Sequence, residues 1–259
     1  MNKPNFNAML NKVPEVILSF WIIKILATTV GETVADFLST TLNLGLDTTS
    51  YIMGWLLIIA LIIQFRSKKY VPVYYWIAVV LISIVWTLTT DKMVDDLDIS
   101  LVTTTIIFAI ALIVTFVTWY LQEKTLSIHS ITTRKREAFY WLAILCTFAL
   151  GTASGDLLAE GLSLGYLSSV LIFAGSIAII TLAYRYAKLN AILAFWMAYI
   201  LTRPLWASIG DLLSQAPSDG GRGLGTTLTS SIFLLAILVF VIYSSMDNKI
   251  SQQKIEKQS

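Results

Sequence analysis

Four aspartates in this 259-residue sequence stand at matching places in four similar segments. Each is preceded by an aromatic residue followed by a tryptophan, and the tryptophan lies 15 residues before the aspartate. The aspartates are Asp36, Asp91, Asp156 and Asp211; the first and third are 120 residues apart, as are the second and fourth. Because carboxylates are hard oxygen ligands for magnesium, manganese and calcium, and also bind protons, this repeated position is a candidate cation site.

Residues four and eight positions before each aspartate share its face if the segment is an α-helix. Polar and charged residues recur on that face, so we predict an ion- or substrate-binding site that consists of Asp36, Asp91, Asp156, Asp211, Glu32, Thr28, Thr87, Thr152, Lys24 and Arg203. The four aspartates and Glu32 are the predicted metal ligands, and Lys24 and Arg203 are the expected counter-charges. At 1.5 Å rise per residue the aspartates lie about 22 Å from their tryptophans, towards one edge of a bilayer.

A structural role for the same residues is the competing interpretation. The aspartates could be solvated ends of helices, and Glu32, Lys24 and Arg203 could form a buried charge network that fixes packing. Threonine hydroxyls in helices often bond to the backbone of their own helix. The repeated tryptophans are typical of anchors at a membrane boundary.

The elements that position these residues are expected to be membrane helices. Of all residues 56% are hydrophobic and 13% charged, with a mean hydropathy of +0.75, whereas soluble domains are about 25% charged. A membrane helix needs about 20 apolar residues. The sequence contains eight candidates, at 16–38, 50–66, 73–91, 101–122, 138–158, 166–186, 190–213 and 227–246.

The distribution of basic residues predicts the orientation of these eight spans. Fourteen of the 18 lysines and arginines lie in segments 1–15, 66–69, 124–136, 185–188 and 247–259, which fall on one side of the membrane. Since basic loops stay in the cytoplasm, both termini are predicted to be cytoplasmic.

The fold predicted from these features is an all-α integral membrane protein with one membrane domain, residues 1–259. Four two-helix repeats are expected at about 16–69, 72–124, 137–188 and 191–246, with polar tails at 1–15 and 247–259. A two-helix unit returns the chain to the side on which it started, so the repeats are parallel and related by an axis along the membrane normal. We expect a pseudo-fourfold bundle with the aspartate helices grouped around that axis.

Other classes of site are poorly supported by the sequence. One cysteine, Cys146, and one histidine, His129, do not provide the usual zinc or copper ligands within a single chain. A net charge of +2 without a basic patch does not indicate nucleic-acid binding. We therefore expect the lipid bilayer and a small cation or small molecule as partners, and no required cofactor.

One stretch resembles a known group of sequences. It runs from Lys12-Val-Pro-Glu-Val through Trp21-Ile-Ile-Lys24 to Thr28-Thr-Val-Gly31-Glu32-Thr-Val-Ala-Asp36. It is similar to a family of bacterial polytopic proteins labelled uncharacterised membrane-anchored proteins, and the resemblance continues through the repeats. It implies a multi-pass protein of the bacterial inner membrane and carries no assigned activity.

The function predicted from the sequence is transport of a small cation, such as the divalent metal manganese, through a central acidic cavity, by a channel or a carrier. Intramembrane ionisable residues commonly mark such pathways. Three alternatives remain open at this point: a carrier for a small organic molecule, a membrane enzyme and a partner subunit of another complex. The enzyme is disfavoured because no nucleophile–base pair is recognisable.

Overall fold

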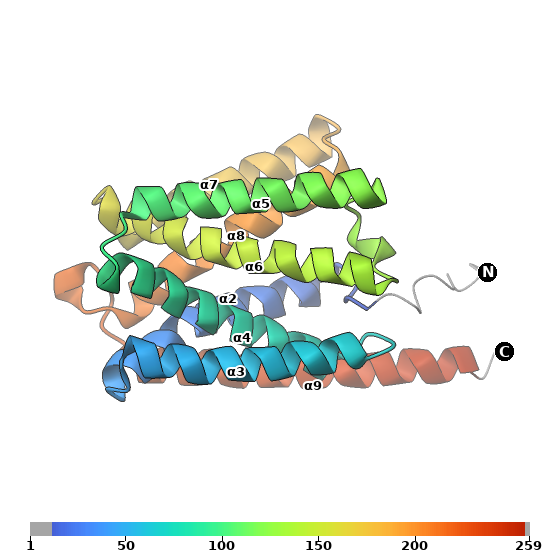
Figure 1. Cartoon of the computed structure of the whole chain (residues 1–259), viewed down its shortest axis with the longest axis horizontal. Coiled ribbons are helices and arrows are strands. Elements are labelled where there is room, and N and C mark those ends of the chain that lie inside the picture. Colours follow the sequence, from blue (N-terminus) through green and yellow to red (C-terminus); the bar gives the residue numbers. More distant parts are fainter. Residues whose placement is uncertain (1–11, 257–259) are drawn as a thin grey trace.

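The computed structural model describes residues 12–256, and within them the chain forms eight long helices (Figure 1). Residues 1–11 and 257–259 of the predicted tails lie outside the described residues. All eight helices are long and apolar enough to cross a membrane, which confirms the predicted fold class. The helices are α2 (Leu18–Asp36), α3 (Gly45–Arg66), α4 (Pro72–Asp91), α5 (Leu101–Glu123), α6 (Arg134–Asp156), α7 (Gly165–Tyr186), α8 (Ala191–Ser214) and α9 (Thr226–Glu256).

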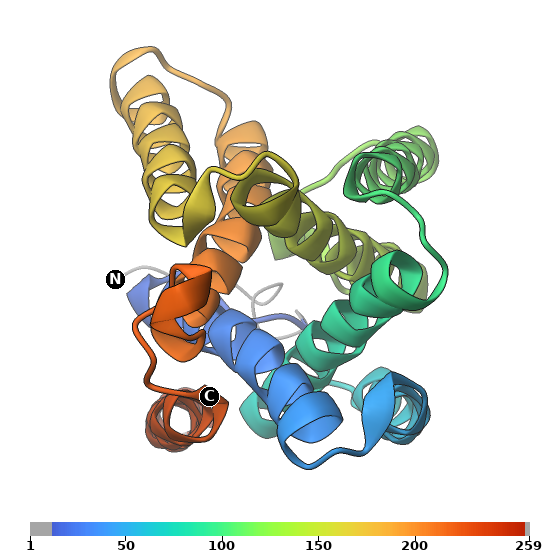
Figure 2. The ribbon, with the colours of Figure 1, turned by 90° about the vertical axis from the view of Figure 1, so that its left-hand side faces the viewer.

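The first helices of the four repeats form an inner ring, and the second helices lie outside it (Figure 2). Around the ring, α2 packs on α4, α4 on α6, α6 on α8, and α8 on α2. Each outer helix packs against the inner helix of the following repeat: α3 on α4, α5 on α6 and α7 on α8. The last helix, α9, packs on α2 and closes the ring. The repeats are therefore parallel and arranged with pseudo-fourfold symmetry.

The inner and outer helices bury different amounts of apolar surface. In the most apolar stretch of each inner helix 50–67% of the residues are buried, whereas in the outer helices the share is 17–22%. Outward-facing side chains of the outer helices, such as Ile113, Leu171 and Val239, are at least 60% exposed. In a bilayer this apolar surface faces lipid, and the inner ring is shielded from it.

The aspartates mark the point where each inner helix changes geometry. In three repeats a π-helical turn follows the aspartate, at Phe37–Thr41, Lys92–Asp96 and Leu157–Gly161. Seven residues after the aspartate, Asn43, Asp98 and Ser163 each have φ between +52° and +55°. The three connections to the outer helices therefore share one conformation, and the fourth differs, with a 3₁₀ turn at Pro217–Asp219.

The repeated tryptophans lie within the protein core. Trp76, Trp141 and Trp196 are only 2–3% exposed and belong to the main hydrophobic cluster. The interpretation of these side chains as anchors at the membrane boundary is therefore wrong for these three. The aromatic–tryptophan pairs pack the inner helices together at the end where α2 begins, opposite the aspartate end.

Candidate functional site

Glu32, Asp156 and Asp211 converge at the aspartate end of the inner ring. Each can offer one carboxylate oxygen such that the three atoms lie within 4.8 Å of one another. Glu32 and Asp211 are 5% and 8% exposed. The three residues come from α2, α6 and α8, so three repeats contribute one ligand each. Among the residues described, the carboxylate of Asp211 makes no hydrogen bond or ion pair with another residue.

The other two predicted aspartate ligands lie outside this group of three. Asp36 is partly buried, and its Oδ2 accepts a hydrogen bond of 3.3 Å from Gln215 Nε2. Asp91 is also partly buried, at the equivalent end of α4. The structure thus brings together three of the five predicted metal ligands and leaves two beside them.

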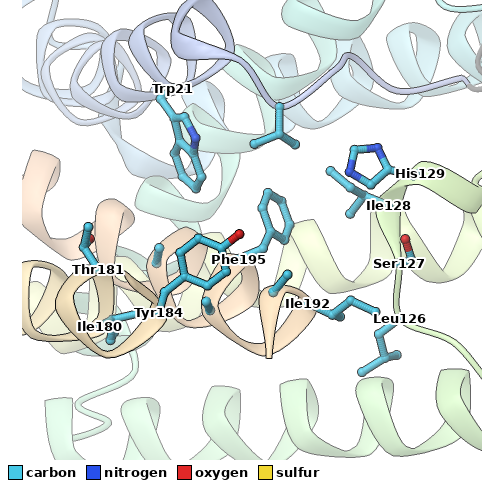
Figure 3. Close-up of a pocket in the computed structure, with 14 residues that line it drawn as sticks. Trp21, Leu126, Ser127, Ile128, His129, Ile180, Thr181, Tyr184, Ile192 and Phe195 are labelled. Carbon is cyan, nitrogen blue, oxygen red and sulfur yellow. The ribbon is translucent and has the colours of Figure 1, made fainter. Parts of the chain in front are cut away.

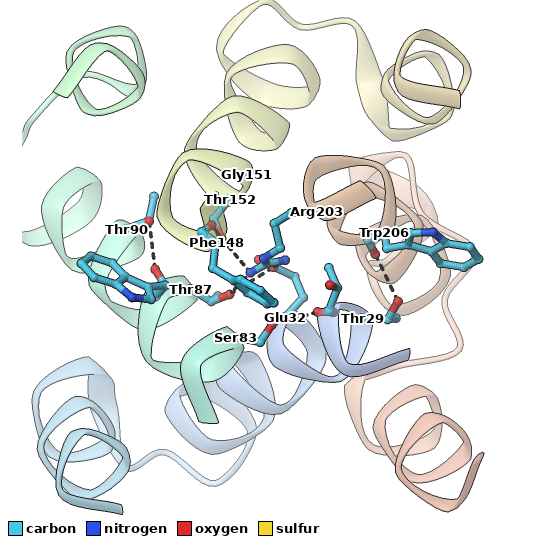
Figure 4. Close-up of polar contacts among 12 residues, drawn as sticks. Thr29, Glu32, Ser83, Thr87, Thr90, Phe148, Gly151, Thr152, Arg203 and Trp206 are labelled. Atoms are coloured by element: carbon cyan, nitrogen blue, oxygen red, sulfur yellow. Dashed lines mark hydrogen bonds and ion pairs between the residues drawn. The ribbon is translucent and has the colours of Figure 1, made fainter. Parts of the chain in front are cut away.

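Arg203 is fully buried and lies one helical turn below the level of Glu32; Figure 4 shows its side chain among Glu32, Thr87 and Thr152. Its Nη1 donates to Glu32 Oε2 at 3.0 Å, and its Nη2 donates to the hydroxyls of Thr87 at 2.9 Å and Thr152 at 2.7 Å. The Thr87 hydroxyl in turn donates to Glu32 Oε2 at 3.1 Å. One guanidinium therefore connects all four inner helices.

Repeat geometry explains why these partners meet. Glu32, Thr87 and Thr152 each stand four residues before an aspartate, so they form one layer, and Ala207 is the fourth member. Arg203 stands eight residues before Asp211, one turn deeper, and reaches upward into the layer. Since alanine leaves space on the α8 side, the long arginine side chain can reach the three polar members.

Glu32 uses its two oxygens differently. Oε2 accepts the bonds from Arg203 and Thr87, while Oε1 accepts none from any side chain that the structure describes. An oxygen held in orientation by its neighbour in this way is suited to bind a metal ion, because partners behind a ligand fix its direction.

Lys24 is a second fully buried cation on α2. Its Nζ donates to the Tyr199 carbonyl at 2.9 Å and to the Thr202 hydroxyl, and it lies 4.3 Å from the Tyr199 ring centroid. Within residues 12–256 it forms no ion pair. The hydroxyl of the predicted site residue Thr28 donates a hydrogen bond of 3.0 Å to the Lys24 carbonyl. It thus bonds to the backbone of its own helix, as the competing structural interpretation expects.

Aromatic side chains close the ring below Lys24. Phe20, Tyr75, Tyr140 and Phe195 each stand 16 residues before an aspartate and so form a layer. The hydroxyls of Tyr75 and Tyr140 are 2.5 Å apart, and the ring centroids of Phe20 and Phe195 are 6.4 Å apart. The site predicted from the sequence did not include this layer, although the aromatic residue that precedes each repeated tryptophan indicated it.

A buried polar cluster that the sequence did not reveal lies at the end where α2 begins. Lys12 Nζ pairs with Glu137 Oε2 at 2.5 Å, and Gln64 Nε2 donates to Glu137 Oε1 at 3.3 Å. Gln64 and Glu137 are fully buried, and Lys12 is 7% exposed. Lys12 was predicted to belong to a polar tail, but its ion pair allows it to be buried. The cluster ties the chain before α2 to α3 and α6.

The inward-facing side chains of the inner ring thus form a column that runs from the aspartates through Arg203 and Lys24 to the aromatic layer. It is acidic at one end, where Asp36, Asp91 and Asp156 are partly exposed, and aromatic rings close it at the other end. Along it, five carboxylates face two basic side chains, Lys24 and Arg203, so the fully ionised column carries an excess of negative charge. Buried charges of one sign are unfavourable without counter-ions or protons. The three converging carboxylates could hold a hard divalent cation, for which the donor set of carboxylate oxygens is appropriate.

Comparison with known proteins agrees with the repeat structure. A family described as Repeat of Unknown Function (DUF347) matches the chain at residues 19–70, 74–125, 139–189 and 194–249. These four segments coincide within a few residues with the predicted repeats. No curated protein matches the sequence, and no solved structure matches it. Because its four repeats cover most of the residues, the chain belongs to the DUF347 repeat family.

Proposed function

We propose that this protein is a membrane transporter for a small divalent cation, such as manganese, that binds to Glu32, Asp156 and Asp211. The observation that carries the proposal is the convergence of three carboxylates from three repeats within 4.8 Å. Oxygen ligands of magnesium lie about 2.0–2.1 Å from the ion, so oxygens on opposite sides of one ion are about 4 Å apart, and a small movement of these side chains would bring all three to one ion. We place the protein in the inner membrane of a bacterium, as the resemblance of its first repeat implies.

The closed lower half of the column favours a carrier over an open channel. A cation that leaves the carboxylates must pass the Arg203–Glu32 pair, then Lys24 and then the aromatic layer. Repulsion by two buried cations opposes this passage while the helices keep this arrangement. Release on the opposite side therefore requires the inner helices to move apart, as in transport by alternation between two states.

Metal binding tests the proposal directly. Protein in nanodiscs is titrated with Mn²⁺, and the free ion is followed by its electron paramagnetic resonance signal; flux of Mn²⁺ into proteoliposomes is measured in parallel. We expect one site per chain. Asp156→Asn and Asp211→Asn each remove a ligand charge and should weaken binding at least about tenfold, about 1.4 kcal/mol, and abolish flux.

The matched control is Asp219→Asn, the same change in an exposed loop residue near the same end of the molecule. It should bind and transport Mn²⁺ as the unaltered protein does. Absence of binding for Mn²⁺, Mg²⁺ and Ca²⁺, or equal loss in the Asp219 variant, would refute the proposed cation site.

A carrier for a small organic anion is the second candidate, and the buried Lys24 favours it because no acid neutralises it within the described chain. The two functions differ in their response to Lys24→Met. With Lys24→Met, a cation carrier should still bind Mn²⁺, whereas an anion carrier should no longer bind its substrate. In the anion carrier, Asp211→Asn should have little effect on substrate binding.

A further inference from the structure

A pocket of about 420 Å³ lies outside the column, between α2, α7, α8 and the segment that precedes α6 (Figure 3). Trp21, Phe195 and Ile180 give it an apolar lining, and Ser127, Thr181 and Tyr184 add hydroxyl groups. Its volume is within the range of about 300–1,000 Å³ typical of sites for small molecules. None of these residues belongs to the carboxylate site.

The pseudo-fourfold symmetry shows what fills the corresponding place elsewhere in the ring. Trp196 on α8 is the repeat equivalent of Trp21, and two aromatic side chains of α5 cover it. Phe116 and Trp119 have ring centroids 4.9 Å and 5.9 Å from Trp196. Trp119 is fully buried. At that corner, an indole and a phenyl ring occupy the space between the helices.

In the next repeat the same two positions carry different side chains. Phe116 and Trp119 follow Asp91 by 25 and 28 residues, and Thr181 and Tyr184 follow Asp156 by the same distances. Threonine is too small to replace the phenyl ring, and Tyr184 is 51% exposed. The ring of Trp21 is consequently only partly buried, unlike its three equivalents at 2–3%.

We propose that this pocket binds a small aromatic amphipathic molecule of the size and character of an indole or a phenol. Its ring would occupy the space that Phe116 and Trp119 fill in the other corner, in contact with Trp21 and Phe195, since aromatic rings favour edge-on or offset contacts with one another. Its polar group would meet the hydroxyl groups at the pocket wall. Ser127 and Tyr184 make no hydroxyl hydrogen bond to another described residue, so both are available.

A lipid acyl chain fits this lining less well, because it offers no polar group to Ser127 or Tyr184. The pocket also lies at the end where α2 begins, opposite the carboxylates. Binding there is consequently independent of the proposed cation site, and the two proposals can fail separately.

Indole itself is the probe for this site. Purified protein in phosphatidylcholine nanodiscs is titrated with indole, and binding is measured by saturation-transfer NMR and calorimetry. The double variant Thr181→Phe/Tyr184→Trp copies the side chains of the preceding repeat and should fill the pocket. We expect it to weaken indole binding at least tenfold without loss of thermal stability. Thr181→Phe alone serves if the double variant does not fold.

The control pair, Leu182→Phe/Tyr186→Trp, adds the same rings to exposed positions of the same helix, where Leu182 is 55% and Tyr186 78% exposed. It should bind indole as the unaltered protein does. Two results would overturn the proposal: equal indole binding by the filled and unaltered proteins, or no indole binding by the unaltered protein. In the second case, a co-purified phospholipid that only the filled variant lacks would identify an acyl chain as the occupant.

Discussion

At the scale of single residues, Arg203 is the side chain on which the polar column depends. It is fully buried, and its three hydrogen bonds reach one residue in each of the other repeats. Its charge is balanced by Glu32, which also belongs to the carboxylate group. The same contacts therefore stabilise the ring and orient a candidate metal ligand.

Replacement of Arg203 by methionine should destabilise the protein strongly. Methionine keeps an unbranched apolar chain but leaves Glu32 buried without its partner, and breaking a buried ion pair in this way costs about 3–5 kcal/mol. The double variant Arg203→Met/Glu32→Gln removes the stranded charge and should recover most of that loss. The free energy of unfolding is measured by titration with denaturing detergent, followed by circular dichroism.

A cost below about 1 kcal/mol for Arg203→Met, the value typical of exposed pairs, would contradict this account. A double variant as unstable as the single one would also contradict it, because the loss would then come from packing of the arginine chain and not from the buried charge.

The sequence predicted which residues share a helix face, but not which side chains contact one another between neighbouring helices. The four-residue spacing from each aspartate placed Glu32, Thr87 and Thr152 at equivalent positions. It could not show that Arg203, from the layer below, reaches all three, because this depends on the small size of Ala207 and on the distance between helices. For Lys12 the sequence suggested solvent, since its partner Glu137 is 125 residues away.

At the scale of elements, glycines set how closely neighbouring inner helices approach. A Cβ at Gly31 would collide with Ser83 on α4, and a Cβ at Gly151 would collide with the Arg203 side chain on α8. The two glycines stand at the same place in repeats one and three, five residues before the aspartate. Trp86 and Trp206 stand there in repeats two and four. Trp86 packs edge-on against Phe108 of α5, and Trp206 points away from Arg203 (Figure 4).

Gly151→Ala should therefore be more harmful than its size suggests. The added methyl group displaces Arg203 from Glu32, Thr87 and Thr152, and overpacking of this kind costs about 1–3 kcal/mol. Gly175→Ala is the matched control, since that glycine lies in the exposed face of α7 with nothing within 4 Å of the new Cβ. It should be neutral or slightly stabilising, because alanine favours helix.

Both variants are compared by thermal unfolding and by Mn²⁺ titration. Gly151→Ala should lower the unfolding temperature and weaken Mn²⁺ binding, because Glu32 loses the partner that orients it. If Gly151→Ala and Gly175→Ala behave alike, close packing at this glycine does not control the site.

At the scale of the whole molecule, the packing of α8 and α9 on α2 closes the ring and makes the last repeat a neighbour of the first. The repeats and their pseudo-fourfold bundle could be predicted because Trp and Asp recur at a fixed spacing in two-helix units. The packing of each outer helix on the inner helix of the following repeat could not be predicted, since that spacing does not specify which neighbour an outer helix contacts. The buried charges near the centre are departures from this symmetry, since one arginine, one glutamate and one lysine occupy single positions of otherwise equivalent layers. The partly open corner at Trp21 is a departure of the same kind.

The orientation of this ring in the membrane is a further prediction from sequence, and it decides from which side the proposed transporter would load its cation. The basic segments 66–69, 124–136 and 185–188 lie at the end where α2 begins, so the carboxylates should open away from the cytoplasm. In a Cys146→Ala background, single cysteines are introduced at the exposed positions Ser218, near the aspartate end, and Thr132, in the segment before α6. A membrane-impermeant maleimide should label Ser218→Cys in intact cells and Thr132→Cys only after permeabilisation. The reverse labelling would contradict the predicted orientation and place the carboxylates on the cytoplasmic side, so that the proposed transporter would load its cation from within the cell.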